Sequence, residues 1–329
     1  MFKIRHLIIG SVLLYSALFY GQFTDVINSN QPGVSMSPFS VGKTVIQAEI
    51  GFYSFKEKNE TVNFEYKADG YGSDLSLRYG AFFEQLELIV NLQYQYENYK
   101  TSSIENGINS GLKKTVIGAK YLLYDPEKNY IKKPNLYSWK ANHSYKWRQF
   151  IPSVGLYGGF NINLSNDVFF RQKSDVFPDK KVSPKGMIMT QNQFGNSVLV
   201  CNLIVDKFPT NTSINYVVTL TRGFSPRLSG FIEAQGINGL YHKDSFLRGG
   251  AAFLVQQNIQ VDGYVATNFK ETPSVFNFGV GMSWRFDSNY DEVMLRIPKE
   301  KKGNDKGKKD KKKDKAKKRL DEIGGEKTK

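Results

Sequence analysis

A regular alternation of apolar and polar side chains recurs between residues 43 and 287 and limits the folds open to this chain. From residue 276 to residue 286 every even-numbered side chain is apolar or aromatic, and every odd-numbered one is small, polar or charged. Residues 86–97 and 214–221 follow the same period of two with few exceptions. Successive side chains of a β-strand point to opposite faces, so each segment has one apolar and one polar face. The region shows no 3.6-residue period, and the pattern therefore predicts an all-β fold.

Polar residues, glycines and prolines interrupt the alternation and divide the region into about twelve expected strands. Each is long enough to cross a bilayer at a tilt, for which about 9–11 residues are needed. Closure of an antiparallel bacterial barrel requires an even number of strands. The expected strands are 43–56, 72–82, 86–99, 111–124, 149–164, 183–194, 197–206, 212–224, 228–240, 246–256, 259–269 and 276–287.

Composition and charge placement favour a membrane barrel over a secreted β-sandwich. The chain has 24 Phe and 19 Tyr, yet its mean hydropathy is −0.42, and no apolar run long enough for a membrane helix follows residue 21. A sandwich would have shorter strands with their polar faces in water. Here charges recur in mid-strand on the polar face, and aromatic residues gather near strand ends. We therefore expect residues 43–287 to form a transmembrane antiparallel up-and-down β-barrel in the outer membrane.

The expected connections alternate in length. Tight turns are expected at 83–85, 195–196, 225–227 and 257–258, and the longer, polar connections are 57–71, 100–110, 165–182, 207–211, 241–245 and 270–275. Outer-membrane barrels have short periplasmic turns and long outer loops. The count of strands then places the long 125–148 connection and the C-terminal tail on the periplasmic side.

The first 42 residues divide into two parts. Residues 1–21 have a basic start, an apolar stretch and Gly21 before Gln22, which is typical of a cleaved secretory signal. Residues 22–42 are polar, contain Pro32 and Pro38, and show no alternation. This segment could fold into the lumen as a plug or extend into the periplasm.

Two basic regions carry most of the net charge of +14. Residues 299–329 hold 15 Lys and Arg against seven Asp and Glu, a net of +8, so we expect a disordered, Lys-rich periplasmic tail at 288–329. The 125–148 connection combines basic and aromatic residues. An anionic periplasmic surface or protein is the expected partner of both, and secretion argues against nucleic acid. The basic and aromatic candidates of the connection are Lys132, Lys133, Trp139, Lys140, Lys146, Trp147 and Arg148.

Nine ionisable residues are expected on the lumen face, five acidic and four basic. A barrel of this size encloses side chains and at most a narrow water column. The charges either line a path for a small polar or amphipathic solute, or form a salt-bridge network that fills a closed barrel. Arg78 and Glu49, on neighbouring strands, are expected to share one cluster. The lumen candidates are Glu49, Asp74, Arg78, Glu87, Lys120, Glu233, Arg248, Asp262 and Arg285.

Enzymatic features are scarce. The single Cys201 and three histidines leave little for a metal site, and no phosphate or dinucleotide motif is present. His242, Asp244 and Ser245 share an expected outer loop, but three such residues in one loop are more often only a loop. We therefore expect no enzyme activity, no metal and no cofactor.

Short motifs spread over residues 24–287 add a resemblance. Together they resemble the outer-membrane transporters grouped with the meta-pathway phenol degradation protein, in the form of a Bacteroidota-type member. The resemblance implies a twelve-stranded transporter barrel, and the family name implies aromatic compounds; the 125–148 connection and the Lys-rich tail depart from its pattern. The motifs are Thr24-Asp25, Asn30, Pro32-Gly33, Ser35, Ser37-Pro38-Phe39, Val41-Gly42, Gln47, Glu49, Gly51, Leu77-Arg78-Tyr79-Gly80, Glu84, Leu86-Glu87-Leu88, Phe231-Ile232-Glu233, Gln260-Val261-Asp262 and the run from Gly279 to Phe286.

Two functions stay open at this point. One is an outer-membrane channel or transporter for small polar or amphipathic, and possibly aromatic, solutes. The other is a closed structural barrel that anchors the basic tail and the 125–148 connection to an anionic surface or partner.

Overall fold

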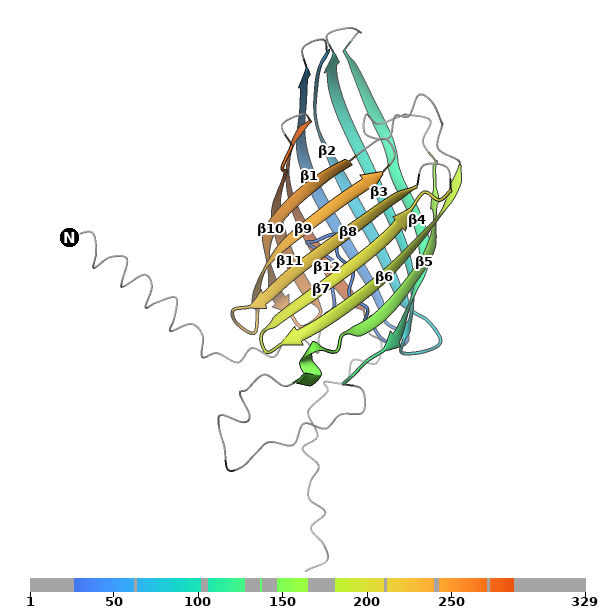
Figure 1. The fold of residues 1–329 in the computed structure, drawn as a ribbon, viewed down its shortest axis with the longest axis vertical. Helices are drawn as coiled ribbons and strands as arrows, with labels where there is room; N and C mark the ends of the chain where they lie inside the picture. The colour runs from blue at the N-terminus through green and yellow to red at the C-terminus, as the bar shows by residue number, and fades with distance from the viewer. Residues whose placement is uncertain are drawn as a thin grey trace, which may run out of the picture. The chain divides into compact units, whose positions relative to one another are not determined.

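The computed structural model describes residues 27–61, 64–101, 106–127, 137, 147–164, 181–209, 212–239, 243–270 and 273–286. Within these residues, twelve β-strands form one closed barrel (Figure 1). Each strand pairs antiparallel with its neighbours in the sequence, and the first strand pairs with the last. The predicted all-β, antiparallel up-and-down barrel is therefore confirmed. No helix in the described part of the chain is long and apolar enough to cross a membrane.

The strands are tilted and of unequal length, and those of the first third are the longest (Figure 1). A 3₁₀ helix, η2 (Trp147–Phe150), precedes the fifth strand. The strands are β1 (Ile46–Thr61), β2 (Phe64–Gly80), β3 (Leu86–Thr101), β4 (Gly107–Tyr124), β5 (Ser153–Ile162), β6 (Val182–Phe194), β7 (Ser197–Asp206), β8 (Ser213–Gly223), β9 (Leu228–Gly239), β10 (Lys243–Gln256), β11 (Ile259–Asn268) and β12 (Ser274–Phe286).

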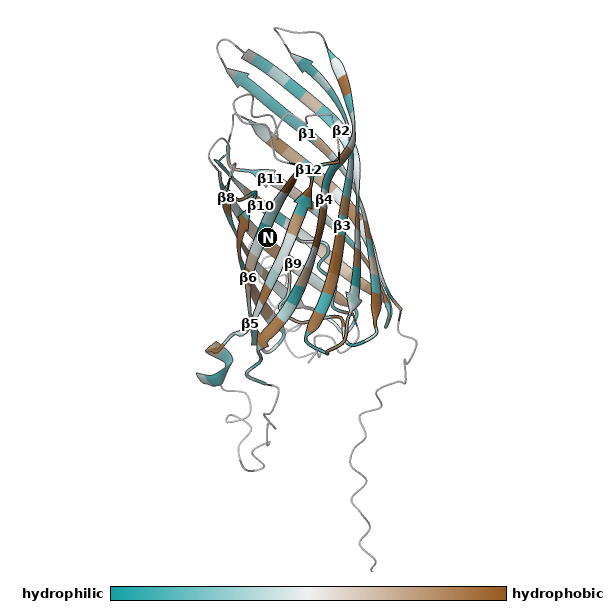
Figure 2. Cartoon of the chain, turned by 90° about the vertical axis from the view of Figure 1, so that its right-hand side faces the viewer, coloured by the Kyte–Doolittle hydropathy of each residue, from teal (hydrophilic) through white to brown (hydrophobic). Residues whose placement is uncertain are grey.

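The outward side chains form an apolar band, as the alternation predicts. Figure 2 shows hydrophobic residues recurring along the strands. On β12 the whole even-numbered series from Phe276 to Phe286 is exposed, and Val280 in mid-strand is 48% exposed. The odd-numbered series faces inward and includes the fully buried Ser283. On β3 the same rule leaves Leu88 exposed and buries Glu87. Because every backbone amide of a closed barrel is paired in the sheet, this apolar band can contact hydrocarbon directly.

The main error in the expected strand limits lies in the first hairpin. Residues 57–71, expected as a loop, are mostly strand, because β1 continues to Thr61 and β2 starts at Phe64. The charges in this region suggested a loop. The structure pairs them instead: Lys67 Nζ lies 3.6 Å from Glu60 Oε1 across the hairpin, and within the strands Lys58 Nζ lies 2.6 Å from Glu60 Oε1 and Lys67 contacts Glu65. Polar outward side chains are tolerated here because a strand can continue beyond the lipid into water.

Three smaller differences separate the observed strand limits from the expected ones. Strand β3 continues to Thr101 and β4 starts at Gly107, so the expected 100–110 loop is shorter. Strand β10 starts at Lys243, inside the expected 241–245 loop. Residues 149–152 are not strand: η2 ends at Phe150, and Pro152 has no N–H to donate to the sheet. Strand β7 has the predicted limits of 197–206.

The two ends of the barrel differ in their connections. Tight connections lie between β2 and β3, β6 and β7, β8 and β9, and β10 and β11, and the turn between β6 and β7 uses Gly195 at φ +60°. The start of β1 and the end of β12 lie at this same end, because the strand number is even and β1 pairs antiparallel with β12. We call it the turn end; it is the end that the sequence leads us to expect on the periplasmic side. The opposite end is the loop end.

Candidate functional site: the barrel lumen

Four charged side chains meet on the inner wall near the turn end. They come from β1 to β4, where the alternation turns Glu49, Arg78, Glu87 and Lys120 inward. Arg78 Nη1 lies 2.8 Å from Glu49 Oε1, and Arg78 Nε lies 2.6 Å from Glu87 Oε1. Lys120 Nζ lies 3.1 Å from Glu87 Oε2, and all four side chains are at most 1% exposed. We call these residues the first charged cluster; its two acids and two bases compensate one another, and the expected pairing of Arg78 with Glu49 is confirmed.

A second charged cluster lies across the lumen on β8 to β11. Arg248 of β10 contacts Glu233 of β9, its cross-strand neighbour. Thr219 of β8 donates its hydroxyl to Glu233 Oε2 at 2.8 Å. The Arg248 guanidinium also lies 5.4 Å from the centre of the Tyr264 ring, which is within the range of a cation–π interaction. Glu233 is thus buried, with its charge compensated by Arg248 and its second oxygen bonded to the Thr219 hydroxyl.

The chain segment before β1 follows the inner wall around the lumen. Its contacts visit the strands in nearly the order in which they adjoin, from β12 back to β3. Ser29 Oγ lies 2.7 Å from Ser283 Oγ of β12, and Ser37 donates to Gln191 Oε1 of β6 at 2.8 Å. We call residues 27–42 the N-terminal hoop. The contacts in order are Ser29 with β12, Gln31 with β11, Val34 and Ser35 with β9, Met36 with β7, Ser37 with β6, Phe39 with β4 and Val41 with β3.

Carboxylates of the wall accept hydrogen bonds from the backbone of the hoop. Glu233 receives the N–H groups of Val34 and Ser35, each at 3.0 Å. Glu49 accepts from the Asn30 N–H at 3.2 Å, and Glu87 accepts from the Val41 N–H at 2.9 Å. A buried carboxylate is stabilised by such bonds in addition to its salt bridges. Each acidic residue of the two clusters therefore also holds the hoop.

Donors of the wall bind the carbonyl groups of the same segment. Most hydrogen bonds between the hoop and the wall are therefore made to backbone groups of the hoop. They determine the path of its backbone and involve few of its side chains. The bonds are Arg78 to Asn28 O at 2.5 Å, Gln47 to Asn28 O at 3.0 Å, Lys120 to Phe39 O at 2.7 Å, Asn202 to Met36 O at 2.9 Å and Gln260 to Gln31 O at 3.3 Å.

Two glycines show how closely the hoop fits the wall. A Cβ atom on Gly33 of the hoop would lie 2.5 Å from Glu233 Oε2, the oxygen that also receives the Ser35 N–H. A Cβ on Gly281 of β12 would lie 2.2 Å from Gln31 Oε1. Neither position has room for a side chain unless its neighbour moves.

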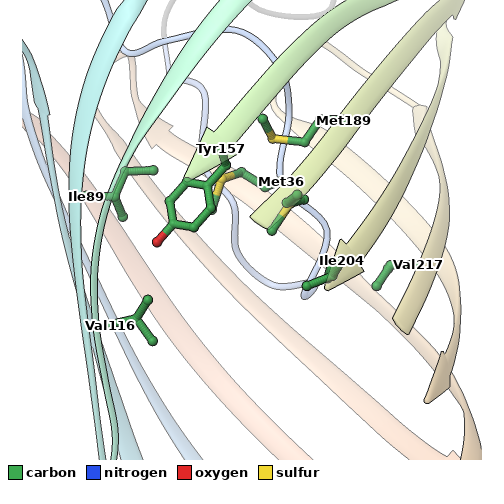
Figure 3. Packing of buried hydrophobic residues seen from close by; sticks show 8 residues of the cluster. Met36, Ile89, Val116, Tyr157, Met189, Ile204 and Val217 are labelled. Carbon is green, nitrogen blue, oxygen red and sulfur yellow. The ribbon is translucent and has the colours of Figure 1, made fainter. Parts of the chain in front are cut away.

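One half of the lumen wall carries an apolar cluster (Figure 3). Met36 of the hoop lies among inward side chains of β3 to β8, which include Tyr157 and Met189. The sequence suggested a polar lumen face throughout and missed this cluster, although its members have the inward parity. Apolar side chains are stable here because they pack on one another and on the hoop. The cluster is Met36, Ile89, Val116, Tyr157, Met187, Met189, Ile204 and Val217.

A cavity of about 510 Å³ lies between the hoop and the turn end of β6 to β12. The hoop contributes one side of it, including Ser29, Ser35 and Ser37. The wall contributes residues near the turns, including Arg227 and Arg285.

The other expected lumen residues also face inward, at separate positions on the wall. Asp74 lies on β2 and Asp262 on β11, and Arg285 lies on β12 beside the cavity. Gln260 approaches Asp262 Oδ2 at 3.5 Å. All nine lumen candidates therefore lie on the inner face, but they divide between two clusters and single positions.

Further charged groups near the loop end were missed. Lys185 of β6 and Asp206 of β7 form an inward pair with Nζ and Oδ2 3.8 Å apart. Glu97 of β3 is buried and accepts the Tyr66 hydroxyl at 2.9 Å. Glu97 has the parity of Glu87 and lies within the alternating residues 86–97, so it belonged among the lumen candidates.

The basic candidates of the 125–148 connection lie mostly outside the described residues, as does the tail 287–329. Trp147 and Arg148 are described: Trp147 is 84% exposed in η2, and Arg148 donates to Pro126 O. Lys132, Lys133, Trp139, Lys140 and Lys146 are not described, nor are residues 1–26.

Two of the three residues weighed as a catalytic set, Asp244 and Ser245, are described, and His242 lies outside the described residues. Asp244 and Ser245 are successive residues of β10 rather than members of one loop. Successive strand residues point to opposite faces, so these two cannot share a site. Asp244 instead accepts bonds from Asn268 Nδ2, the shorter at 3.2 Å.

A closed barrel with an apolar outer band and a polar, charged interior is the architecture of an outer-membrane β-barrel. The sequence also carries a family signature over residues 29–286, and the chain belongs to the family described as "Putative MetA-pathway of phenol degradation". Among curated protein sequences, none matches the chain.

Solved β-barrels are similar in outline. The translocator domain of the autotransporter NalP from Neisseria meningitidis has a TM-score of 0.47 at 10% identity, covering 75% of this chain and 91% of its own. KdgM porin has a TM-score of 0.42 at 10% identity, covering 72% and 99%. A TodX mutant, a monoaromatic hydrocarbon channel, has a TM-score of 0.37 at 7% identity, covering 80% and 96%.

Proposed function

We propose that this protein is an outer-membrane channel for small polar or amphipathic solutes and that its N-terminal hoop closes the lumen. The observation that carries the proposal is the path of the hoop around the inner wall. Three wall carboxylates accept its N–H groups, and five wall donors bind its carbonyl groups. Each such bond contributes about 0.5–3 kcal/mol, with the upper values where one partner is charged, so together the bonds hold the hoop firmly.

The apolar cluster supports an amphipathic solute. When the hoop leaves the wall, the lumen would present Met187, Met189 and Tyr157 on one side and the second charged cluster on the other. Methionine side chains adapt to irregular apolar partners, including aromatic rings. Because the family is described by phenol degradation, aromatic compounds are the first solutes to test. In this role the lumen candidates guide a solute, and no residue acts as a catalyst.

Conductance in a planar bilayer tests the closing role. Ser29 and Ser283 have their hydroxyl oxygens 2.7 Å apart, so the pair Ser29→Cys and Ser283→Cys can lock the hoop by a disulfide. The native Cys201 is changed to Ser in this background. We expect few open events from the oxidised lock, more from the reduced one, and sustained conductance after deletion of residues 28–41. Equal conductance of the deletion variant and the wild type would reject the closing role.

A closed structural barrel is the second candidate, and the compensated first charged cluster favours it. In that case no hoop variant would conduct. Trp147, exposed beside Arg148 at the turn end, supports the accompanying proposal that the 125–148 connection and the basic tail bind an anionic periplasmic surface. Deleting residues 299–329 should then leave the barrel folded and weaken binding to anionic vesicles, most strongly at low salt.

A further inference from the structure

We propose that the cavity at the turn end is a binding site for small amphipathic anions and that an occupant holds the hoop in place. Its volume of about 510 Å³ is within the ordinary range of small-molecule sites. The site adjoins the second charged cluster through Thr219, which lines the cavity and donates to Glu233, but no carboxylate of either cluster lines it.

The charged side chains that line the cavity have one sign. Among the described residues that line it, Arg227 and Arg285 are charged and none carries a carboxylate. Arg227 belongs to the turn between β8 and β9, and Arg285 is an inward residue of β12. A guanidinium presents a planar pair of donors that matches a carboxylate. The cavity is therefore suited to an anion and unsuited to a cation.

An apolar surface covers another part of the same wall. It is formed by inward side chains of β7, β9 and β10 near the turn end, where water-filled barrels carry polar groups. Phe231 and Val198 are its most buried large members. An occupant with an apolar body and one anionic head would meet both surfaces. The apolar lining residues of these strands are Val198, Val200, Phe231, Ala252 and Leu254.

The hoop forms the remaining side of the cavity. A ligand that touches both the wall and the hoop binds the closed form better than the open form, and so shifts the population toward closure. This coupling rests on the proposed closing role, whereas binding itself does not. A solute that accumulates on the periplasmic side would in this way limit its own entry.

Three probes with one apolar body and different heads test the ligand class: hexanoate, 1-hexanol and hexylammonium. Binding to the full-length protein in detergent is measured by titration calorimetry. We expect saturable binding of hexanoate, at least tenfold weaker binding of 1-hexanol, and none of hexylammonium. Equal affinity for hexanoate and hexylammonium would overturn the proposal.

Arginine variants locate the site. Arg227→Gln and Arg285→Gln should each weaken hexanoate binding about tenfold, the scale expected for one charged hydrogen bond. Arg222→Gln is the matched control, because Arg222 is exposed at the turn end of β8 and does not line the cavity. Arg227 lies in an exposed turn, so its variant should fold even if the Arg285 variant does not. Equal loss in Arg222→Gln and Arg227→Gln would reject the site.

Cysteine labelling tests the coupling. Met36 is a buried hoop residue that does not line the cavity, so Met36→Cys in a Cys201→Ser background reports release of the hoop. Hexanoate at saturation should slow its maleimide labelling several-fold, and hexylammonium should not. Hexanoate binding without slower labelling would reject the coupling and leave the site, while a hoop deletion that fails to conduct would reject only the closing role.

Discussion

Strands β1 and β2 contribute to two networks of ion pairs, one near each end of the barrel. Near the turn end, Arg78 and Glu49 are fully buried and hold the hoop as well as each other. Near the loop end, Lys58 and Glu60 form a contact as short, but their side chains are 52% and 47% exposed. The two networks use the same types of residue, but one is buried and the other is exposed to water. A pair in water is screened and gains little, whereas a buried charge has no substitute for its partner.

The largest effect is expected from breaking the buried network. Arg78→Met leaves Glu49 without its cation and removes two bonds to Glu87, so it should lower the free energy of unfolding by about 3–5 kcal/mol. Urea unfolding in lipid vesicles, followed by tryptophan fluorescence, measures it. Adding Glu49→Gln to Arg78→Met should recover part of the loss, and zero coupling between the two changes would contradict the cluster.

A charge on the lipid side of the wall should have the next largest effect. Val280 faces outward in the middle of β12, so Val280→Arg should cost about 2–4 kcal/mol, as expected for a cation near the bilayer midplane. Val280→Leu is the control and should fold like the wild type. The fraction of heat-modifiable protein on a gel gives the comparison, and equal yields would mean that this face does not meet lipid.

A smaller effect should follow from pushing the hoop off the second charged cluster. The Cβ atom added by Gly33→Ala requires the Glu233 carboxylate to move and weakens its bonds to Val34 and Ser35, at a cost of about 1–3 kcal/mol. Channel open probability should rise about tenfold with little loss of barrel stability. Gly186→Ala, where nothing lies within 4 Å of the new atom, is the control. An unchanged open probability in Gly33→Ala would show that the contact of the hoop with Glu233 does not keep the channel closed.

The smallest effect is expected in the exposed network. Lys58→Ala removes a pair that water already screens, so the midpoint of urea unfolding should stay unchanged within error. A loss approaching that of Arg78→Met would show that the loop end of β1 and β2 is packed against something in the membrane.

Much of this arrangement was predictable because the alternation is a local property. The parity of each strand places Glu87 inward and Leu88 outward wherever the strand begins, and it brought Arg78 and Glu49 to one face before any contact was known. The strand limits at the loop end were harder to predict. Charged residues such as Lys58 and Lys67 are typical of loops. Only the backbone pairing of these two residues across the hairpin shows that the strands continue.

The sequence by itself determined the class of fold, the facing of the strands and the family, because each depends on residue order alone. It left the path of residues 27–42 undecided, and only the tertiary structure placed them along the inner wall. The physical reason is distance along the chain: Ser29 meets Ser283 across 254 residues, and Val34 meets Glu233 across 199. The hoop is held mainly through its backbone, and every residue except proline has the same backbone N–H and C=O groups. No periodicity could therefore have indicated which wall residues would hold it, or that a cavity would lie beneath it.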